Sequence, residues 1–263
     1  MKITRNVLIA IIAVYLVAAV LSFGKWRPAG GPPALWDHIW MLALCILSPL
    51  VDLLLFPQLQ RSAAAGVRAA RPRAYICIIV FSWTLTAVIL AQWLHQGRPW
   101  SALGIGLGSP VNFMAGVVIT TLYLRAVWTQ RREMLANPDR LRRLHGSLGK
   151  AEALIPHVPS ERLCFAAVSV TAGICEELLF RGFALWYVAA WAGPVVAVAV
   201  SSVLFGLAHL YLGKAHVGRS ALFGGMFALI VLASGSLWPA MVIHAAIDLV
   251  AGDLGYRAVT GAA

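Results

Sequence analysis

The chemically most demanding stretch of the sequence is 176–181, where the residues EELLFR place two carboxylates and a guanidinium inside an apolar run. On insertion scales, an acidic or basic residue at the centre of a membrane helix costs about 2.5 to 3.5 kcal/mol. Such groups persist within a membrane when they pair with one another or face a protein interior, where they usually serve a function. We therefore expect a functional site at this stretch.

Helical spacing divides the three charges into a pair and a free acid. Each residue of an α-helix advances by about 100°, so Glu177 and Arg181 share a face and can form an ion pair. Glu176 points about 100° away from that face and is not the natural partner of Arg181. We therefore predict that Glu177 supports the site, and that Glu176 is available for general acid–base chemistry.

Two later runs add polar groups at helical spacing. Phe205 precedes His209 by one turn, and His244 precedes Asp248 by one turn. A carboxylate one turn from a histidine can accept a hydrogen bond from the ring and fix its tautomer and orientation. Neighbouring predicted helices thus carry two histidines, three acids and an arginine. This combination favours an active site over chance packing.

In order and spacing, these runs resemble the signature of the CPBP family of intramembrane proteases, also called the Abi or type II CAAX endopeptidase family. That signature reads EExxxR, then FxxxH, then HxxxN or HxxxD. The resemblance implies that Glu176 and His209 activate a water molecule that attacks a peptide carbonyl, without a metal or other cofactor. It also implies that His244 and Asp248 bind the developing oxyanion or orient its donor. Because an ionised aspartate repels an oxyanion, we expect Asp248 to position His244.

Other activities fit parts of the same pattern. Two histidines and a glutamate also form a legitimate catalytic zinc set, although no HExxH sequence is present. Some relatives within the family are linked to immunity against bacteriocins, which could require binding without turnover. A proton-coupled transporter would also use buried glutamate and histidine, but no internal repeat is visible. The predicted substrate is a membrane-anchored protein or hydrophobic peptide that enters from lipid into a polar cavity among the last four spans.

The composition requires a membrane protein. Hydrophobic residues make up 60% of the 263 residues and charged residues 12%, whereas a soluble domain has about 25% charged residues. The apolar runs are continuous and not alternating, which favours helices over a barrel. We predict an all-α fold with eight transmembrane helices at 7–23, 35–56, 74–94, 111–128, 163–191, 194–212, 221–233 and 237–254.

These helices form one predicted polytopic domain over 1–263. Its parts are N-terminal helices at 1–129, a basic cytoplasmic or interfacial segment at 130–162, and catalytic helices at 163–255. The first apolar run resembles a signal peptide but is long for one, and we expect it to be a retained helix. Pro49 is expected to kink the second span.

The net charge of +11 indicates membrane topology and not nucleic-acid binding, because the basic residues cluster in alternate loops. With the N-terminus inside, 17 lysines and arginines fall in inner segments and 3 in outer loops. The positive-inside rule then predicts a multi-pass protein of the plasma membrane, the inner membrane of the cell, with both termini cytoplasmic.

Within the basic segment, apolar residues recur at helical spacing with arginines opposite them. We expect an amphipathic helix on the anionic inner leaflet, with Asp139 as its N-cap; a solvated linker helix is the alternative. The apolar positions are Leu141, Leu144, Leu148, Ala151 and Ile155.

Several residues outside the motifs have simpler interpretations. Asp52 lies near the inner end of its span and is expected to reach the interface. The four cysteines lie in apolar segments without CxxC spacing and are expected to be small buried hydrophobes. Gly224 and Gly225 predict close helix packing or room for a substrate backbone.

Overall fold

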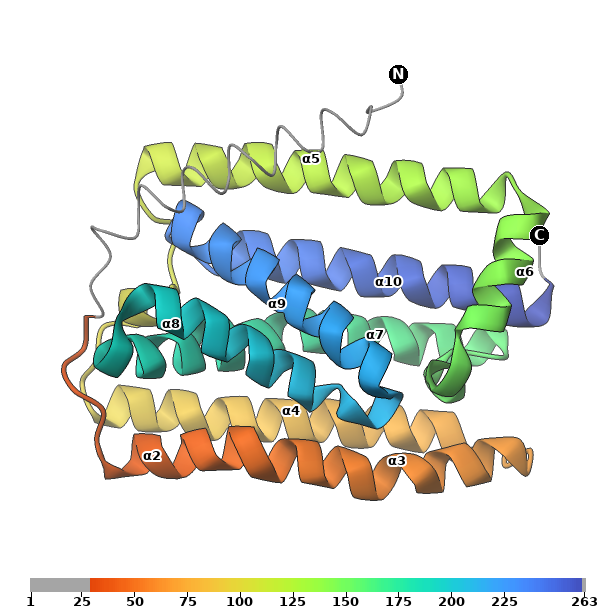
Figure 1. Cartoon of the computed structure of the whole chain (residues 1–263), viewed down its shortest axis with the longest axis horizontal. Helices are drawn as coiled ribbons and strands as arrows, with labels where there is room; N and C mark the ends of the chain where they lie inside the picture. The colour runs from red at the N-terminus through yellow and green to blue at the C-terminus, as the bar shows by residue number, and fades with distance from the viewer. Residues whose placement is uncertain (1–28, 262–263) are drawn as a thin grey trace.

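The long apolar runs form helices that lie side by side in a bundle in the computed structural model, which describes residues 29–261 (Figure 1). Every regular element among these residues is helical. The expected first span, 7–23, lies outside the described residues. The elements are α2 (Leu35–Leu42), η1 (Ala43–Leu47), α3 (Ser48–Ala64), α4 (Ala70–His95), η2 (Trp100–Leu103), α5 (Pro110–Leu135), α6 (Pro138–Ser147), η3 (Gly149–Leu154), α7 (Pro159–Glu176), η4 (Glu177–Ala184), α8 (Leu185–Ala208), η5 (Leu210–Leu212), α9 (Lys214–Ser234) and α10 (Trp238–Thr260).

Five helical stretches in the described part of the chain are long and apolar enough to cross a membrane. One of them, Pro159–Ala208, has 50 residues and contains two predicted spans. Its backbone leaves helical geometry at Gly193 (φ 77°, ψ 171°), directly before Pro194, so α8 turns there. The prediction of an all-helical, multi-pass membrane protein is therefore confirmed, while the number of eight spans stays a prediction. The five stretches are Leu35–Ala64, Ala70–His95, Pro110–Leu135, Pro159–Ala208 and Lys214–Ser234.

Two of the long stretches contain a π-helical segment, with hydrogen bonds from residue i to i+5. One is η1, which ends just before Pro49. Proline lacks an amide hydrogen, so a wider turn before it accommodates the missing hydrogen bond without ending the helix. The other is η4, which carries Glu177 and Arg181. π-Helical turns are rare and often occur at functional sites.

The basic segment forms a shorter α-helix than expected. Asn137, not Asp139, is the N-cap of α6: its side chain accepts hydrogen bonds from the amides of Asp139 (3.0 Å) and Arg140 (3.2 Å). Pro138 favours this arrangement because it occupies the first helical position, where an amide hydrogen is not needed. Gly149, with φ +53°, ends the α-helical geometry, and the 3-10 helix η3 follows.

Small residues let the helices that carry the motifs approach closely. A Cβ atom on Gly173 of α7 would lie 2.8 Å from the amide nitrogen of Ala245 on α10. A Cβ atom on Gly224 of α9 would lie 3.1 Å from both the Cα of Ser202 and the Nη2 of Arg181. The close packing predicted at Gly224 is therefore present, and both contacts fix helices that carry motif residues.

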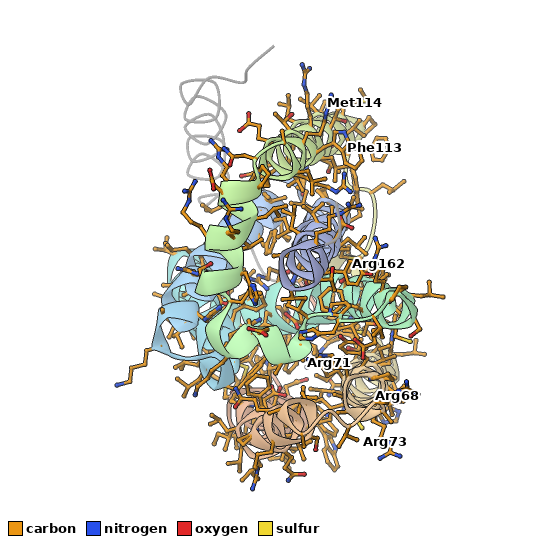
Figure 2. All side chains as sticks on the ribbon, turned by 90° about the vertical axis from the view of Figure 1, so that its right-hand side faces the viewer. Arg68, Arg71, Arg73, Phe113, Met114 and Arg162 are labelled. Carbon is orange, nitrogen blue, oxygen red and sulfur yellow. The ribbon has the colours of Figure 1, made fainter. Side chains whose placement is uncertain are left out.

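Arginines gather at one end of the bundle, where α6 crosses the ends of α5 and α10 (Figure 1). Figure 2 faces this end, with Arg68, Arg71 and Arg73 near the start of α4 and Arg162 near the start of α7. The apolar helices and the clustered cations agree with a membrane protein that presents one basic face.

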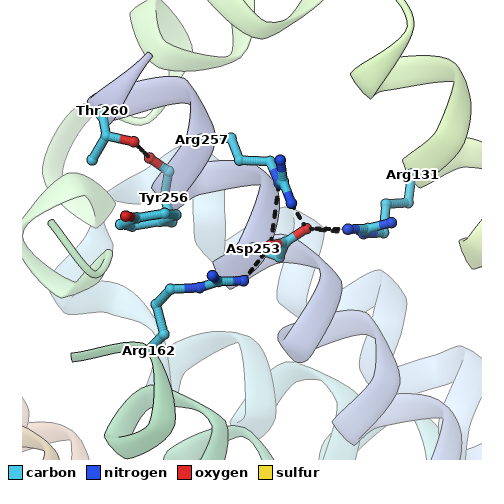
Figure 3. Close-up of polar contacts among 6 residues, drawn as sticks. All are labelled: Arg131, Arg162, Asp253, Tyr256, Arg257 and Thr260. Carbon is cyan, nitrogen blue, oxygen red and sulfur yellow. Dashed lines mark hydrogen bonds and ion pairs between the residues drawn. The ribbon is translucent and has the colours of Figure 1, made fainter. Parts of the chain in front are cut away.

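An aspartate ties three helices together at this end (Figure 3). Asp253 of α10 accepts hydrogen bonds from Arg131 of α5 (2.9 Å) and Arg162 of α7 (2.8 Å). Arg257, one turn further along α10, donates to both oxygens of the same carboxylate at 3.3 Å. Each bond is charge-assisted, which makes this contact stronger than a neutral hydrogen bond.

The opposite end contains few cations, and the described one is neutralised. Arg98 forms a buried ion pair with Asp37 at 2.7 Å. Its guanidinium lies over the rings of Trp93 (5.0 Å) and Trp186 (4.4 Å). These contacts fix the loop after α4 against the start of α2.

The cysteines only partly match the expectation. All four are free, and Cys175 is buried, but Cys45 and Cys164 are half-buried and Cys77 is exposed. Cys77 lies on the face of α4 that lines a cavity described below, which explains its exposure.

Candidate active site

The predicted pair of Glu177 and Arg181 is present in the interior of the bundle. Oε1 of Glu177 lies 3.1 Å from Nη1 of Arg181, and both side chains are fully buried. The guanidinium also lies over the rings of Phe205 (4.0 Å), Phe227 (5.4 Å) and Phe180 (5.9 Å). An ion pair and three aromatic faces thus offset part of the cost of burying this cation, whose Nε and Nη2 atoms make no hydrogen bond to a described residue.

Glu177 also holds a histidine from another helix. Its Oε1 atom lies 2.8 Å from Nδ1 of His244 on α10. A carboxylate can only accept a hydrogen bond, so Nδ1 of His244 donates. The ring is stacked on Phe227 at 5.0 Å with an interplanar angle of 17°. Sequence spacing did not reveal this contact, because the two residues are 67 positions apart and their approach depends on how α10 packs on α7.

The other ring nitrogen of His244 faces two acids. Nε2 lies 3.6 Å from Asp248 and 4.0 Å from Glu176. The expected pairing of His244 with Asp248 is therefore present at ion-pair distance, longer than a hydrogen bond. The hydrogen bond that fixes the ring comes from Glu177 instead.

His209 is oriented by its own helix. Its Nδ1 atom lies 2.8 Å from the carbonyl oxygen of Phe205, and the two rings are 4.8 Å apart. A carbonyl oxygen only accepts, so Nδ1 carries the proton. In the neutral ring, Nε2 then has its lone pair available on the other side.

Glu176 and His209 line the same cavity, which has a volume of about 250 Å³. If only the rise per residue along each helix is counted, Glu176 and His209 are expected to differ in membrane depth by more than about 10 Å. A tilt of α7, or a start of α7 in the cytosol, would reduce this difference. The packing of the helices brings both residues to one cavity. Its lining residues are Leu44, Ser48, Val51, Asp52, Leu55, Phe56, Leu59, Ala74, Cys77, Ile78, Phe81, Ser82, Leu85, Leu154, Glu176, Leu179, Phe180, Ala208, His209 and Tyr211.

The location of this cavity corrects two expectations. The cavity was expected among the last four spans, but α3 and α4 form much of its wall, because they pack over η4 and η5. Asp52 of α3 was expected to reach the membrane interface, and it lines this cavity instead. His244 and Asp248 are not among the lining residues.

One oxygen of the Glu176 carboxylate, Oε2, is buried and makes no hydrogen bond to any other residue that the structure describes. Its ion-pair neighbour is Nε2 of His244 at 4.0 Å. A buried polar atom without a hydrogen bond is costly and is usually satisfied by water or a ligand. Glu176 therefore has the geometry of a group that binds a water molecule in the cavity.

The described residues contain no group of three or more histidine, cysteine, aspartate or glutamate side chains arranged to hold a metal ion. The zinc alternative would therefore need ligands beyond that arrangement, such as water or a substrate atom.

Comparison with known proteins identifies the class of this site. Residues 159–250 match the family model described as "Type II CAAX prenyl endopeptidase Rce1-like". The matched segment contains all three motifs, and α2 to α5 lie before it. No curated protein and no solved structure matches the chain significantly.

The match confirms the resemblance to the CPBP family that the motifs predicted. The family supports intramembrane proteolysis as the general function, and the apolar helices support a multi-pass location in a membrane. A membrane-anchored substrate and a lipid environment follow from the same two observations.

Proposed function

We propose that the protein is a glutamic-type intramembrane endopeptidase, in which Glu176 and His209 activate a water molecule for attack on a peptide carbonyl. The observation that carries the proposal is the cavity that both residues line, and one carboxylate oxygen of Glu176 has no hydrogen-bond partner among the described residues. Each residue comes from a different helix, so only the folded bundle assembles the pair.

The protons can be followed through the reaction. The water donates one hydrogen bond to Oε2 of Glu176 and the other to Nε2 of His209, since both atoms are acceptors. As the water oxygen bonds to the carbonyl carbon, Glu176 takes its proton. The C–N bond then breaks, and Glu176 passes that proton to the leaving nitrogen. The products are a carboxylic acid and an amine. Together they contain all the atoms of the water molecule and of the cleaved peptide.

His244 is proposed to stabilise the oxyanion that develops on the carbonyl oxygen. Glu177 holds Nδ1 of His244, so Nε2 is the nitrogen that can act, and it acts as a donor when the ring carries both protons. Asp248, 3.6 Å from Nε2, positions the ring and balances its charge. Arg181 holds the Glu177 carboxylate in place through their ion pair.

The substrate is proposed to be a membrane-anchored protein or a hydrophobic peptide that enters laterally from lipid. The mostly apolar wall of the cavity suits such a segment. The basic end is proposed to face the cytoplasm, with both termini on that side and α6 against the anionic leaflet. A lipidated tail, a C-terminal sorting helix and a leader peptide all remain consistent with this cavity.

The proposal can be tested with purified full-length protein in proteoliposomes. The protein is incubated with a library of single-span and lipidated peptides, and the products are identified by mass spectrometry. Glu176→Gln and His209→Ala are each expected to lower the cleavage rate by at least about 10²-fold, the usual contribution of general acid–base groups. Glu133→Gln makes the same chemical change as Glu176→Gln on an exposed side chain of α5 and should leave the rate unchanged.

Cleavage that continues unchanged in both the Glu176 and the His209 variant contradicts this mechanism. A chelator series with zinc add-back separates the alternatives. Loss of activity with the chelator and recovery with zinc would favour a metal site, whereas full activity throughout supports the glutamate mechanism.

A further inference from the structure

A second acid in the cavity has no role in the proposed reaction. Asp52 of α3 lines the same cavity as Glu176 and His209. No side chain in the described part of the chain donates a hydrogen bond to Asp52 or forms an ion pair with it. The proposed reaction already has its base in Glu176, so Asp52 needs another explanation.

The position of Asp52 is set by the face of α3 that packs over the site. Ser48, Asp52 and Leu55 recur at helical spacing, and all three line the cavity. This face is continued by Phe56 and Leu59, which belong to an apolar cluster with residues of η3 and η5. Asp52 therefore points into the cavity because its neighbours on the same face anchor α3 there.

The charge of the cavity is unbalanced. No lysine or arginine is among its lining residues, and His209 is the one basic group, while Asp52 and Glu176 are both acids. Most other lining residues are apolar. An acid without a partner in such surroundings is costly, and the cost falls when a cation binds beside it.

We propose that Asp52 is a specificity-determining residue that binds a lysine or arginine side chain of the substrate, close to the scissile bond. This inference rests on the proposed protease function. The methylene groups of such a side chain would pack along the apolar wall, and its charged end would reach the carboxylate. The substrate class is thus a hydrophobic segment that contains a basic residue at the cleavage site.

Cleavage of matched peptides tests this preference. One membrane-anchored peptide that the protein cleaves is varied at single positions around its cleavage site, with Lys, Met or Glu at each. We expect kcat/KM for Lys to exceed that for Met by at least about tenfold at one position, with Glu the poorest. Asp52→Asn should remove this ratio, because kcat/KM for the Lys peptide should fall to that for the Met peptide. Glu133→Gln, a carboxylate-to-amide change on an exposed side chain, should keep the ratio.

Charge reversal gives a positive readout that a folding defect does not produce. Asp52→Lys is expected to reverse the order, so that the Glu peptide is cleaved better than the Lys peptide. Equal cleavage of Lys and Met peptides by the wild type overturns the inference. So does an equal loss for both peptides in Asp52→Asn, since Asp52 would then act on the reaction or the fold.

Binding separates this inference from the proposed function. Glu176→Gln protein in nanodiscs is titrated with fluorescent Lys and Met peptides, and Kd is measured by anisotropy. Tighter binding of the Lys peptide that disappears when Asp52→Asn is added supports the inference, even where no peptide of the set is cleaved. Equal binding of both peptides to the Glu176→Gln protein contradicts it, whatever the cleavage assay shows.

Discussion

At the scale of single residues, the site consists of an inner network and an outer pair. Glu177 is the centre of the network, because one oxygen atom contacts both Arg181 at 3.1 Å and His244 at 2.8 Å. Glu176, the adjacent residue, points to the cavity instead. Two neighbouring glutamates thus have different tasks, and the difference follows from the helix face that each occupies.

Arg181→Met tests the network, because it leaves Glu177 buried without its cation. We expect the free energy of unfolding to fall by about 3 to 5 kcal/mol, as for other broken buried pairs. Chemical denaturation in detergent measures the change. Arg140→Gln breaks an exposed pair with Glu133 and should cost about 1 kcal/mol or less.

The double variant Glu177→Gln with Arg181→Met checks the physical reason. If the unpaired carboxylate causes the loss, the double variant should be more stable than Arg181→Met alone. A double variant that is less stable would show that Glu177 stabilises the fold through its contact with His244 even without the arginine.

The sequence was sufficient to predict the ion pair of Glu177 and Arg181, but not the contact of Glu177 with His244. Two residues that are four positions apart on one helix lie next to each other on its surface, so their contact can be predicted from spacing alone. The approach of His244 depends on the rotation of α10 about its own axis, and residue spacing within a helix carries no such information. The place of Asp52 could not be predicted for the same reason, since it follows from the way α3 packs against η3 and η5.

At the scale of elements, close helix contacts determine where the motif residues meet. Gly173 is the contact point between α7, which ends at Glu176, and α10, which carries His244. A larger residue there would push apart the two helices that hold the site. The long helices of the described part were predictable from the apolar runs. The π-helical segments were not, because they differ from α-helix in hydrogen bonding and not in composition.

Gly173→Ala is expected to lower both stability and activity. The new Cβ would lie 2.8 Å from the backbone of Ala245, and such overpacking costs about 1 to 3 kcal/mol. The matched control is Gly218→Ala on α9, where a Cβ meets no atom within 4 Å. That control should be neutral or slightly stabilising, because alanine favours a helix over glycine. Thermal unfolding and cleavage are measured on both variants, and equal behaviour would contradict the packing argument.

At the scale of the whole molecule, one end of the bundle is basic (Figure 2), and at the other end Asp37 neutralises Arg98. This asymmetry was predictable from the loops alone. The wall of the cavity was not, because helices outside the segment 159–250 form part of it, and they carry no motif. The bundle therefore combines a motif-bearing half with a half that closes the site.

Orientation in the membrane can be measured with new cysteines at each end. Ser147→Cys, at the end of α6, is expected to react with a membrane-impermeant maleimide from the cytoplasmic side only. Ser101→Cys, in η2 at the other end, should react from the outside only. The unmodified protein shows the background from its four cysteines. The reverse labelling pattern would contradict the predicted topology.

The π-helical segment η4 also bears on how the chain tolerates the insertion or deletion of a residue. A π-turn holds more residues per turn than an α-turn, so it absorbs extra sequence inside a helix and not in a loop. The flanking helices α7 and α8 can keep their packing while the residues between them change phase. A version of the chain one residue shorter here could still fold, yet its guanidinium and carboxylates would face different directions. The length of the helix at this segment therefore matters to the site as much as its residues.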